Sequence, residues 1–324
     1  MSLVHLWTFL GAALAAWMSL PFWRRVCRRC GLVDEPGPRK IHTGVVPLAG
    51  GLTLAGAWLV TLGLLALAAR GGWGLPPAVA EVWRQALAAQ GAPVAAIAGG
   101  AVGMLLLGLA DDRQELAPGL KFLGQCVIAS AVAWSGVKAT VFIPSAAATF
   151  VLTVLWIVAV SNAFNFQDNM NGLCAGLAVI AAGFFGLVAA RHGQGAVAAL
   201  AFAVAGGAAG FLPWNFPRAR AFLGDSGSHL LGFLLAVLAI LPQYYSADHP
   251  RRAAVLAPLL ILGVPLADLA WVVLYRWGHG RPFYVGDTNH FSHRLERAGL
   301  SRPAAVVVLW GAGLALGAVA LAAL

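Results

Sequence analysis

Carboxylate and carboxamide side chains gather in four segments of this chain, each beside a long apolar run. Asp111 and Asp112 follow the apolar residues 104–110, and Asp225 stands between two glycines. The other two segments are 161–172 and 279–297, which contain Asn162, Asn165, Asp168, Asn169, Asn171, Asp287, Asn289 and Glu296. Carboxylate and amide oxygens are the ligands that Mg2+ prefers in proteins. The four segments therefore predict a magnesium site.

Cationic side chains accompany these oxygen ligands. The segment 279–297 carries His290, His293 and Arg294, and the early segment 34–42 carries Arg39, Lys40 and His42. Guanidinium and imidazole groups favour anionic oxygens, such as those of a pyrophosphate. Together with Mg2+, which bridges phosphate oxygens, this combination predicts phosphoryl transfer.

Each motif taken alone also has a structural interpretation. The pair Asp111 and Asp112 could be a solvated helix cap held by Arg113 or Lys121, and Asp225 could be a helix N-cap. The asparagines could form hydrogen bonds between helices. The two histidines could ligate zinc, and the last segment could bind lipid headgroups. At the level of single motifs these alternatives stay open.

The elements that must position these residues are membrane-spanning helices. Hydrophobic residues make up 60% of the 324 residues and charged residues 10%, whereas soluble domains carry about 25% charged residues. Because lipid offers no partner for an unpaired backbone amide, apolar runs near the roughly 20 residues that cross hydrocarbon must be helical. We therefore predict an all-α integral membrane protein, a single polytopic domain over residues 1–324, with about ten transmembrane helices near residues 3–22, 48–69, 93–110, 119–137, 147–164, 172–190, 194–214, 227–243, 253–275 and 303–323.

The charges are distributed unevenly between the two sides of these helices. Most of the 21 Lys and Arg residues fall in the odd-numbered connections, and the other side holds Arg70, Arg84, Lys138, Arg191, Arg251 and Arg252. Positive connections face the cytoplasm, so both termini are predicted on the non-cytoplasmic side. No basic run is interleaved with aromatic residues on a water-facing surface, which argues against nucleic-acid binding despite the net charge of +9.

Five motifs occur in order along nearly the whole chain. They are segment 34–42 with Pro47, Gly50 and Gly51, the pair Asp111 and Asp112, segment 162–172, segment 224–228 and segment 290–295. In this combination the chain resembles the polyprenyl-phosphate N-acetylhexosamine-1-phosphate transferases. The resemblance implies a multi-pass protein of the bacterial inner membrane with a cytoplasm-facing site. It further implies transfer of a sugar 1-phosphate from a UDP-amino sugar to a polyprenyl phosphate such as undecaprenyl phosphate, with release of UMP; a homodimer is considered as its assembly.

The same resemblance suggests roles for individual residues. Asp225 and Asn165 are expected to hold Mg2+, for which Mn2+ could substitute, and Asp225 is also counted among the catalytic residues. The other two catalytic residues, Asp111 and Asp112, are expected to position or deprotonate the lipid phosphate. The expected substrate-binding residues are Arg39, Lys40, His42, Lys121, Asn162, Asp168, Asn171, His290, His293 and Arg294.

Two departures from the family pattern concern the sugar rather than the reaction. Many bacterial members have Asp-Gly-x-Asp-Gly where this chain has Asn171 as the second acidic position, and Ser292 replaces a histidine common in the N-acetylglucosamine branch. Segment 39–51 resembles that branch more than the muramoyl-pentapeptide branch of peptidoglycan synthesis. An initiator of O-antigen or teichoic-acid synthesis that uses another UDP-N-acetyl sugar is a further alternative.

Two other classes of function remain as alternatives. An ion-coupled secondary transporter is one, because Asp268 lies in the middle of a predicted helix. Pairing of Asp268 with Arg276 is the structural explanation for that carboxylate. A non-catalytic scaffold is the other alternative, given the altered positions Asn171 and Ser292.

Overall fold

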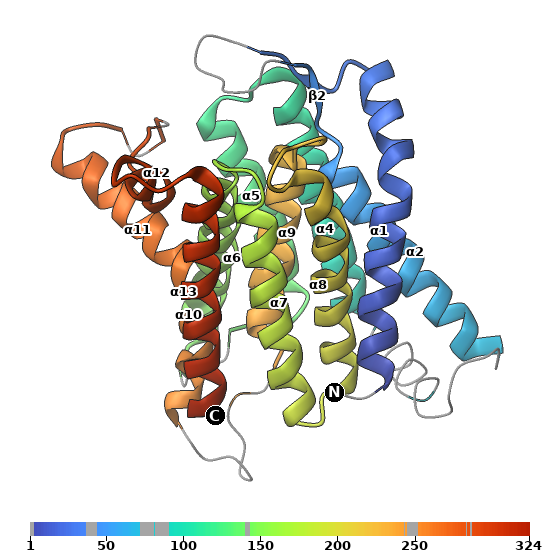
Figure 1. Ribbon diagram of the computed structural model, residues 1–324. Helices are drawn as coiled ribbons and strands as arrows, with labels where there is room; N and C mark the ends of the chain where they lie inside the picture. The colour runs from blue at the N-terminus through green and yellow to red at the C-terminus, as the bar shows by residue number, and fades with distance from the viewer. Residues whose placement is uncertain are drawn as a thin grey trace.

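The computed structural model describes residues 3–36, 44–71, 81, 91–139, 143–242, 244, 252–282, 284, 285 and 287–324. The described chain is a bundle of helices (Figure 1). They are α1 (Leu3–Arg29), α2 (Gly50–Gly71), α4 (Gly91–Gln114), α5 (Pro118–Trp134), α6 (Ala146–Gln167), α7 (Leu173–Arg191), α8 (Gly195–Asn215), α9 (Gly224–Ile240), the 3-10 helix η1 (Arg252–Leu256), α10 (Ala257–Ile261), α11 (Gly263–Gly278), α12 (Phe291–Arg297) and α13 (Arg302–Ala323). The short strands β1 (Val33–Asp34) and β2 (Val46–Pro47) pair antiparallel, with Val33 opposite Pro47.

The helices confirm an all-α integral membrane protein. Seven are long and apolar enough to cross a membrane, and the bent pair formed by residues 254–261 and 263–278 would make eight. α9 is apolar but has only 17 residues. A helix covers part or all of each of the ten predicted runs, whereas the number that span the membrane stays a prediction.

The ninth predicted run, 253–275, is not one straight helix. α10 and α11 meet at Leu262 and are bent by 70°. Pro265 has no amide proton to donate to the carbonyl of Ile261, and Gly263 permits a turn of the backbone, so the sequence itself interrupts the helix. Figure 1 shows the result, with α11 leaning outward from the bundle.

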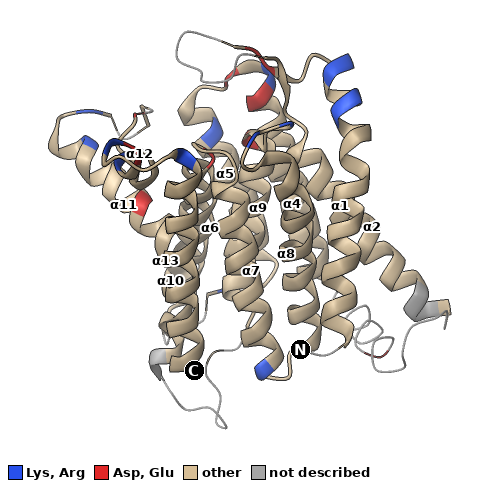
Figure 2. Cartoon of the chain, in the orientation of Figure 1, with Lys and Arg blue, Asp and Glu red and all other residues tan. Residues whose placement is uncertain are grey.

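The two ends of the bundle differ in charge. Figure 2 shows that most of the charged residues drawn lie at the end where α1 and α4 finish and where α12 lies. Both labelled termini lie at the opposite end, near the lower end of α7 with its Arg191 (Figure 1). This arrangement agrees with the sidedness inferred from the charge pattern, and the orientation in a membrane stays a prediction.

α9 is the central helix. All residues from 226 to 239 are buried, and α9 packs against α2, α4, α6, α7 and α8. A helix that is apolar on every side has no face to turn to solvent and is stable only when surrounded. Because α9 begins with Gly224 and Asp225, its central place brings that carboxylate among the ends of its neighbours.

Small residues set the close packing of α8 against α1. A Cβ atom added to Gly206 would lie 2.1 Å from the carbonyl oxygen of Phe9, and one added to Gly210 would lie 2.1 Å from that of Ala13. The two helices therefore touch through their backbones, as small residues permit in membrane proteins.

Replacing Gly206 with alanine should destabilise the protein because the added methyl group forces α8 away from α1. We expect a loss of about 1–3 kcal/mol, typical of overpacking, measured as a lower midpoint of thermal unfolding in detergent. Gly183→Ala in α7 is the control, because its added Cβ meets no atom within 4 Å. An unfolding midpoint for Gly206→Ala equal to that of Gly183→Ala would contradict this packing.

Candidate active site

Gly108 brings the end of α4 against the start of α9. A Cβ atom on Gly108 would lie 2.4 Å from the Cα of Ser226 and 2.5 Å from the carbonyl carbon of Asp225. Only glycine allows the two backbones to come this close. As a result Asp111 and Asp112, which follow Gly108 by about one turn, reach the first turn of α9.

Asp112 caps α9 from outside that helix. Its Oδ1 accepts a hydrogen bond of 2.7 Å from the amide of Asp225, and its Oδ2 accepts one of 3.1 Å from the amide of Ser226. The first amides of a helix have no partner within the helix and carry partial positive charge, so a carboxylate there is favourable. These two amides, which could have held a phosphate, are thus occupied by Asp112.

Lys121 bridges Asp111 on α4 and Asp225 on α9. Its Nζ is in contact with Oδ2 of Asp111 and lies 3.5 Å from Oδ2 of Asp225. Asp111 is 6% exposed and its Oδ1 accepts a 2.8 Å hydrogen bond from the amide of Leu116, whereas the Asp225 side chain is 34% exposed. The ammonium group thereby neutralises part of the repulsion between two carboxylates.

Asn165 on α6 completes the group around Asp225. Its Nδ2 donates to Oδ1 of Asp225 and to Oγ of Ser228, the latter at 3.0 Å. His229 donates from Nδ1 to the main-chain carbonyl of Asp225 at 2.7 Å. Four helices, α4, α5, α6 and α9, thus meet at one point through polar side chains.

Asp168 lies immediately after α6. Burial, together with the negative charges of Asp225 and Asp112, raises the pKa of Asp168 well above its usual range, although a hydrogen bond from the Gly224 backbone opposes this shift. Asp168 therefore lies close enough to Asp112 and Asp225 for their negative charges to disfavour its ionised form. α6 itself ends at Gln167, so Asp168 and Asn171 lie in the turn that follows the helix and not on it.

Asn162 has structural partners. Its Nδ2 donates to Oε1 of Gln125 at 2.6 Å and to the carbonyl of Val158 at 2.8 Å. Gln125 is fully buried on α5. The structure places Asn162 in interhelical hydrogen bonding, one turn below Asn165, and its contact with substrate stays a prediction.

The predicted residues of the last segment lie on or beside α12. His290 pairs through Nδ1 with Asp268 at 2.7 Å, and His293 lies 3.4 Å from Glu296. The guanidinium of Arg294 lies 4.6 Å from the ring centre of Trp271. Within the described residues, no hydrogen bond or ion pair joins these three side chains to the carboxylates of α4 and α9. Asn171 donates to the carbonyl of Pro217 at 3.3 Å.

Arg39, Lys40 and His42 lie outside the described residues. The neighbouring Pro47 and Gly50 have a clear structural role. The carbonyl of Pro47 accepts from the amide of Phe222 at 3.0 Å, and the amide of Gly50 donates to the carbonyl of Phe222 at 3.0 Å. The segment before α2 thus supports the loop that leads into α9.

Sequence reasoning missed three residues that shape this site. Gly108, Gln125 and Ser228 were not identified as functional, although each contacts the polar group or holds one of its members. Ser228 lies three residues after Asp225, a spacing that shares one face of a helix, and this signal was available. Gly108 and Gln125 contact residues of other helices. The sequence alone does not show which helices are neighbours.

Comparison with known proteins places this arrangement in a family. Residues 94–243, which include most of α4 and all of α5 to α9, match the model of glycosyl transferase family 4. The chain is 31% identical over 310 residues to a probable undecaprenyl-phosphate N-acetylglucosaminyl 1-phosphate transferase of Bacillus subtilis, covering 93% of this chain and 80% of the relative. The chain belongs to the polyprenyl-phosphate N-acetylhexosamine-1-phosphate transferase family.

Two further relatives carry related names. A decaprenyl-phosphate N-acetylglucosaminephosphotransferase of Mycobacterium tuberculosis is 33% identical over 337 residues, covering 95% of this chain and 80% of the relative. An undecaprenyl-phosphate alpha-N-acetylglucosaminyl 1-phosphate transferase of Escherichia coli is 26% identical over 310 residues, covering 90% and 77%. The family-model match includes Asp111, Asp112, Lys121, Asn165 and Asp225.

The side chains of this polyprenyl-phosphate transferase fit a hard cation at Asp225. Four carboxylates, those of Asp111, Asp112, Asp168 and Asp225, lie at this end of the bundle, and Lys121 pairs with two of them, Asp111 and Asp225. Their oxygens are suitable ligands for Mg2+. If the side-chain amide of Asn165 rotated so that its oxygen and nitrogen changed places, that oxygen would add a further ligand beside Asp225. No three His, Cys, Asp or Glu side chains converge on one metal position among the described residues, so substrate or water oxygens would complete the coordination.

Removing the carboxylate of Asp112 should destabilise the transferase. Asp112→Ala leaves the amides of Asp225 and Ser226 without their acceptor, and we expect a loss of about 1–2 kcal/mol, as for other helix caps. Thermal unfolding measures this loss, and Arg113→Ala at the next, exposed position is the control. Equal unfolding midpoints for the two variants would show that Asp112 does not cap α9.

The packing of α12 should weaken at low pH. Burial lowers the pKa of His293 below its ordinary value, despite the opposing effect of Glu296. The folded protein thus prefers the neutral imidazole, and this contribution to stability is present above about pH 6.5 and is lost as the pH falls.

We therefore expect smaller hydrogen-exchange protection factors for residues 291–297 at pH 5.5 than at pH 7.5. His293→Gln has no imidazole to protonate and should abolish the difference. A difference of the same size in that variant would assign the pH dependence to another group.

Proposed function

We propose that this protein transfers N-acetylhexosamine 1-phosphate from a UDP-sugar to a polyprenyl phosphate. The observation that carries the proposal is the convergence of Asp111, Lys121, Asn165 and Asp225 from four helices at one end of an apolar bundle. A lipid phosphate held at the membrane surface can reach such a site from the bilayer, while a nucleotide sugar approaches from water. The names of the relatives support the lipid acceptor.

In the proposed reaction an oxygen of the lipid phosphate attacks the phosphorus that carries the sugar. The bond between that phosphorus and the bridging oxygen of UMP breaks, UMP leaves with the electron pair, and a new pyrophosphate links lipid and sugar. A phosphate monoester has its second pKa near 6, so the acceptor is mostly dianionic at neutral pH. It therefore needs alignment and charge compensation more than a strong base, and Lys121 is placed to supply both.

We propose Mg2+ as the cofactor and Asp225 and Asn165 as its protein ligands. When bound, the ion would withdraw charge from the diphosphate of the donor. Asp225 suits this role because its carboxylate is one third exposed, whereas Asp112 is committed to α9 and Asp111 is buried against Lys121. Asp111 is assigned to the side of the lipid phosphate.

We propose UDP-N-acetylglucosamine as the donor and the cytoplasmic face of the bacterial inner membrane as the location of the site. Three relatives named above act on N-acetylglucosamine according to their names, which favours this sugar over the muramoyl-pentapeptide form of the reaction. The charged end of the bundle and the termini at the other end (Figure 2) support the orientation. The transporter alternative loses its main argument, because Asp268 has three hydrogen-bond donors around it.

Purified protein should release UMP from UDP-N-acetylglucosamine only when Mg2+ and undecaprenyl phosphate are both present. Asp225→Asn should lower kcat/KM by at least about 100-fold, because metal ions contribute several kcal/mol of charge stabilisation. Glu115→Gln, an exposed carboxylate at the same end of α4, is the matched control and should retain activity. Full turnover by Asp225→Asn, or release of UMP without lipid phosphate, would refute the proposal.

A further inference from the structure

Asp268 is a buried carboxylate in an otherwise apolar helix, and the proposed reaction gives it no role. It lies in the first half of α11, with 1% of its surface exposed. An acidic side chain within a membrane helix is costly and is retained where it has partners or a function. Its surroundings therefore require an explanation.

Three donors from two other elements converge on this carboxylate. Gln167, the last residue of α6, donates from Nε2 to Oδ2 at 3.0 Å, and Nδ1 of His290 lies 2.7 Å from the same oxygen. The amide of Phe291 donates to Oδ1 at 2.6 Å. Asp268 thus joins the end of α6, the first half of α11 and the start of α12. Arg276, the partner expected from the sequence, pairs instead with Asp287 at 3.0 Å.

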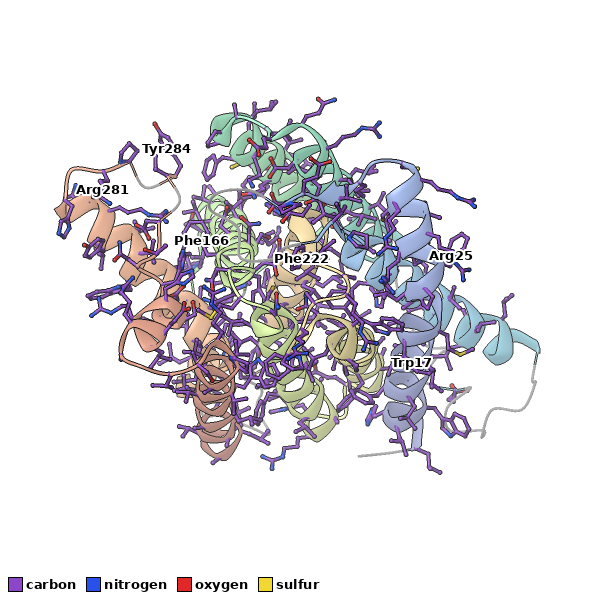
Figure 3. The ribbon with its side chains drawn as sticks, turned by 45° about the horizontal axis from the view of Figure 1, so that its top comes forward. Trp17, Arg25, Phe166, Phe222, Arg281 and Tyr284 are labelled. Carbon is purple, nitrogen blue, oxygen red and sulfur yellow. The ribbon has the colours of Figure 1, made fainter. Side chains whose placement is uncertain are left out.

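The contact with Asp268 fixes the imidazole of His290. A carboxylate accepts hydrogen bonds, so Nδ1 of His290 carries the proton that it donates, and Nε2 is the ring nitrogen that can meet a ligand. The ring also lies edge-on to Phe166, with 5.6 Å between ring centres. Figure 3 shows Phe166 on the side of α6 that faces α11, and the guanidinium of Arg276 lies 5.2 Å from the centre of its ring.

A second hydrogen bond holds α12 to the same place. Oγ of Ser292, which is 1% exposed, donates to Oδ1 of Asn169 at 2.7 Å. Asn169 in turn donates to the carbonyl of Phe166 at 2.6 Å. The start of α12 is therefore held to residues 166–169 directly by Ser292 and indirectly through Asp268, which also accepts from Gln167. These residues directly follow Asn165 and include Asp168.

We propose that Asp268 is a positioning residue for the donor substrate, which orients His290 and holds the start of α12 against the end of α6. The proposal rests on the proposed function, and it assigns Nε2 of His290 to the sugar phosphate half of the UDP-sugar. Asp268 touches no reacting atom. It acts through His290 in the way that a carboxylate behind a metal-bound or catalytic histidine sets the tautomer and orientation of that ring.

A double-mutant cycle on Asp268 and His290 tests this coupling. In Asp268→Asn one carboxylate oxygen becomes an NH2 group, which faces either the amide of Phe291 or Nδ1 of His290, so at least one donor at the start of α12 loses its acceptor and the position of the His290 ring is no longer fixed. Asp268→Asn and His290→Gln should each lower kcat/KM for the UDP-sugar by roughly 10- to 100-fold, the range for partners behind a functional ligand. The KM for the lipid phosphate should change by less than about twofold, which a general structural defect would not achieve.

The double variant decides between the alternatives. If Asp268 acts through His290, the double variant should lose no more activity than His290→Gln alone. Losses that multiply would overturn the proposal. The matched control is Asp287→Asn, which removes a carboxylate from the same segment but does not contact His290 among the described residues, so its effect and that of His290→Gln should multiply.

Two additions keep the result interpretable. If Asp268→Asn does not fold, Ser292→Ala removes the second hydrogen bond and should raise the KM for the UDP-sugar severalfold with the KM for lipid phosphate unchanged; an unaltered KM for the UDP-sugar would overturn the proposal. Calorimetric titration of the wild type with UDP-N-acetylglucosamine separates the two claims. An active wild type with multiplying losses refutes the role of Asp268 alone, whereas a wild type that neither binds nor turns over the donor refutes the proposed function.

Discussion

Negative charge concentrated at one end of an apolar bundle is the constraint on which the rest of this structure depends. Asp111, Asp112, Asp168 and Asp225 lie close enough to repel one another when they are ionised, and the burial of Asp111 limits the screening of its charge by solvent. The chain compensates in two ways. Asp112 accepts hydrogen bonds from the first amides of α9, and Asp111 and Asp225 share Lys121. The remaining excess of negative charge is the reason we propose that this site binds a divalent cation.

Helices pack very closely around this group of carboxylates. Gly108 lets α4 touch the first turn of α9, and Gly51 does the same for α2, since a Cβ atom there would lie 2.4 Å from Oγ of Ser226. α9 is enclosed on all sides, so its first turn has little freedom to move away from its neighbours. The carboxylates are therefore held by backbone contacts, which side-chain motion cannot relax. Farther from this group, Asp268 joins three elements by a different means, through the hydrogen bonds of its buried carboxylate.

Much of this arrangement could be predicted from the sequence, because its signals are local. Apolar runs indicated the helices, and the clustering of Asp and Asn at helix ends indicated that Asp111, Asn165 and Asp225 share one site. The details that could not be predicted depend on contacts between distant residues. The bend at Leu262 required weighing Gly263 and Pro265 against an uninterrupted apolar run. Asp112 caps α9 from α4, and Asn162 pairs with Gln125 of another helix. A single sequence does not show which residues of different helices are in contact.

The central claim is that Asp225, supported by Asp111, Lys121 and Asn165, holds a divalent cation against the diphosphate of a nucleotide sugar. A structure determined with Mn2+ and UDP, using the anomalous scattering of manganese, tests it most directly. The account predicts a manganese peak in contact with the carboxylate of Asp225 and with the diphosphate, and an ammonium group of Lys121 displaced from Asp225 by charge repulsion. UDP bound with manganese elsewhere, while Lys121 still pairs with Asp225, would contradict it.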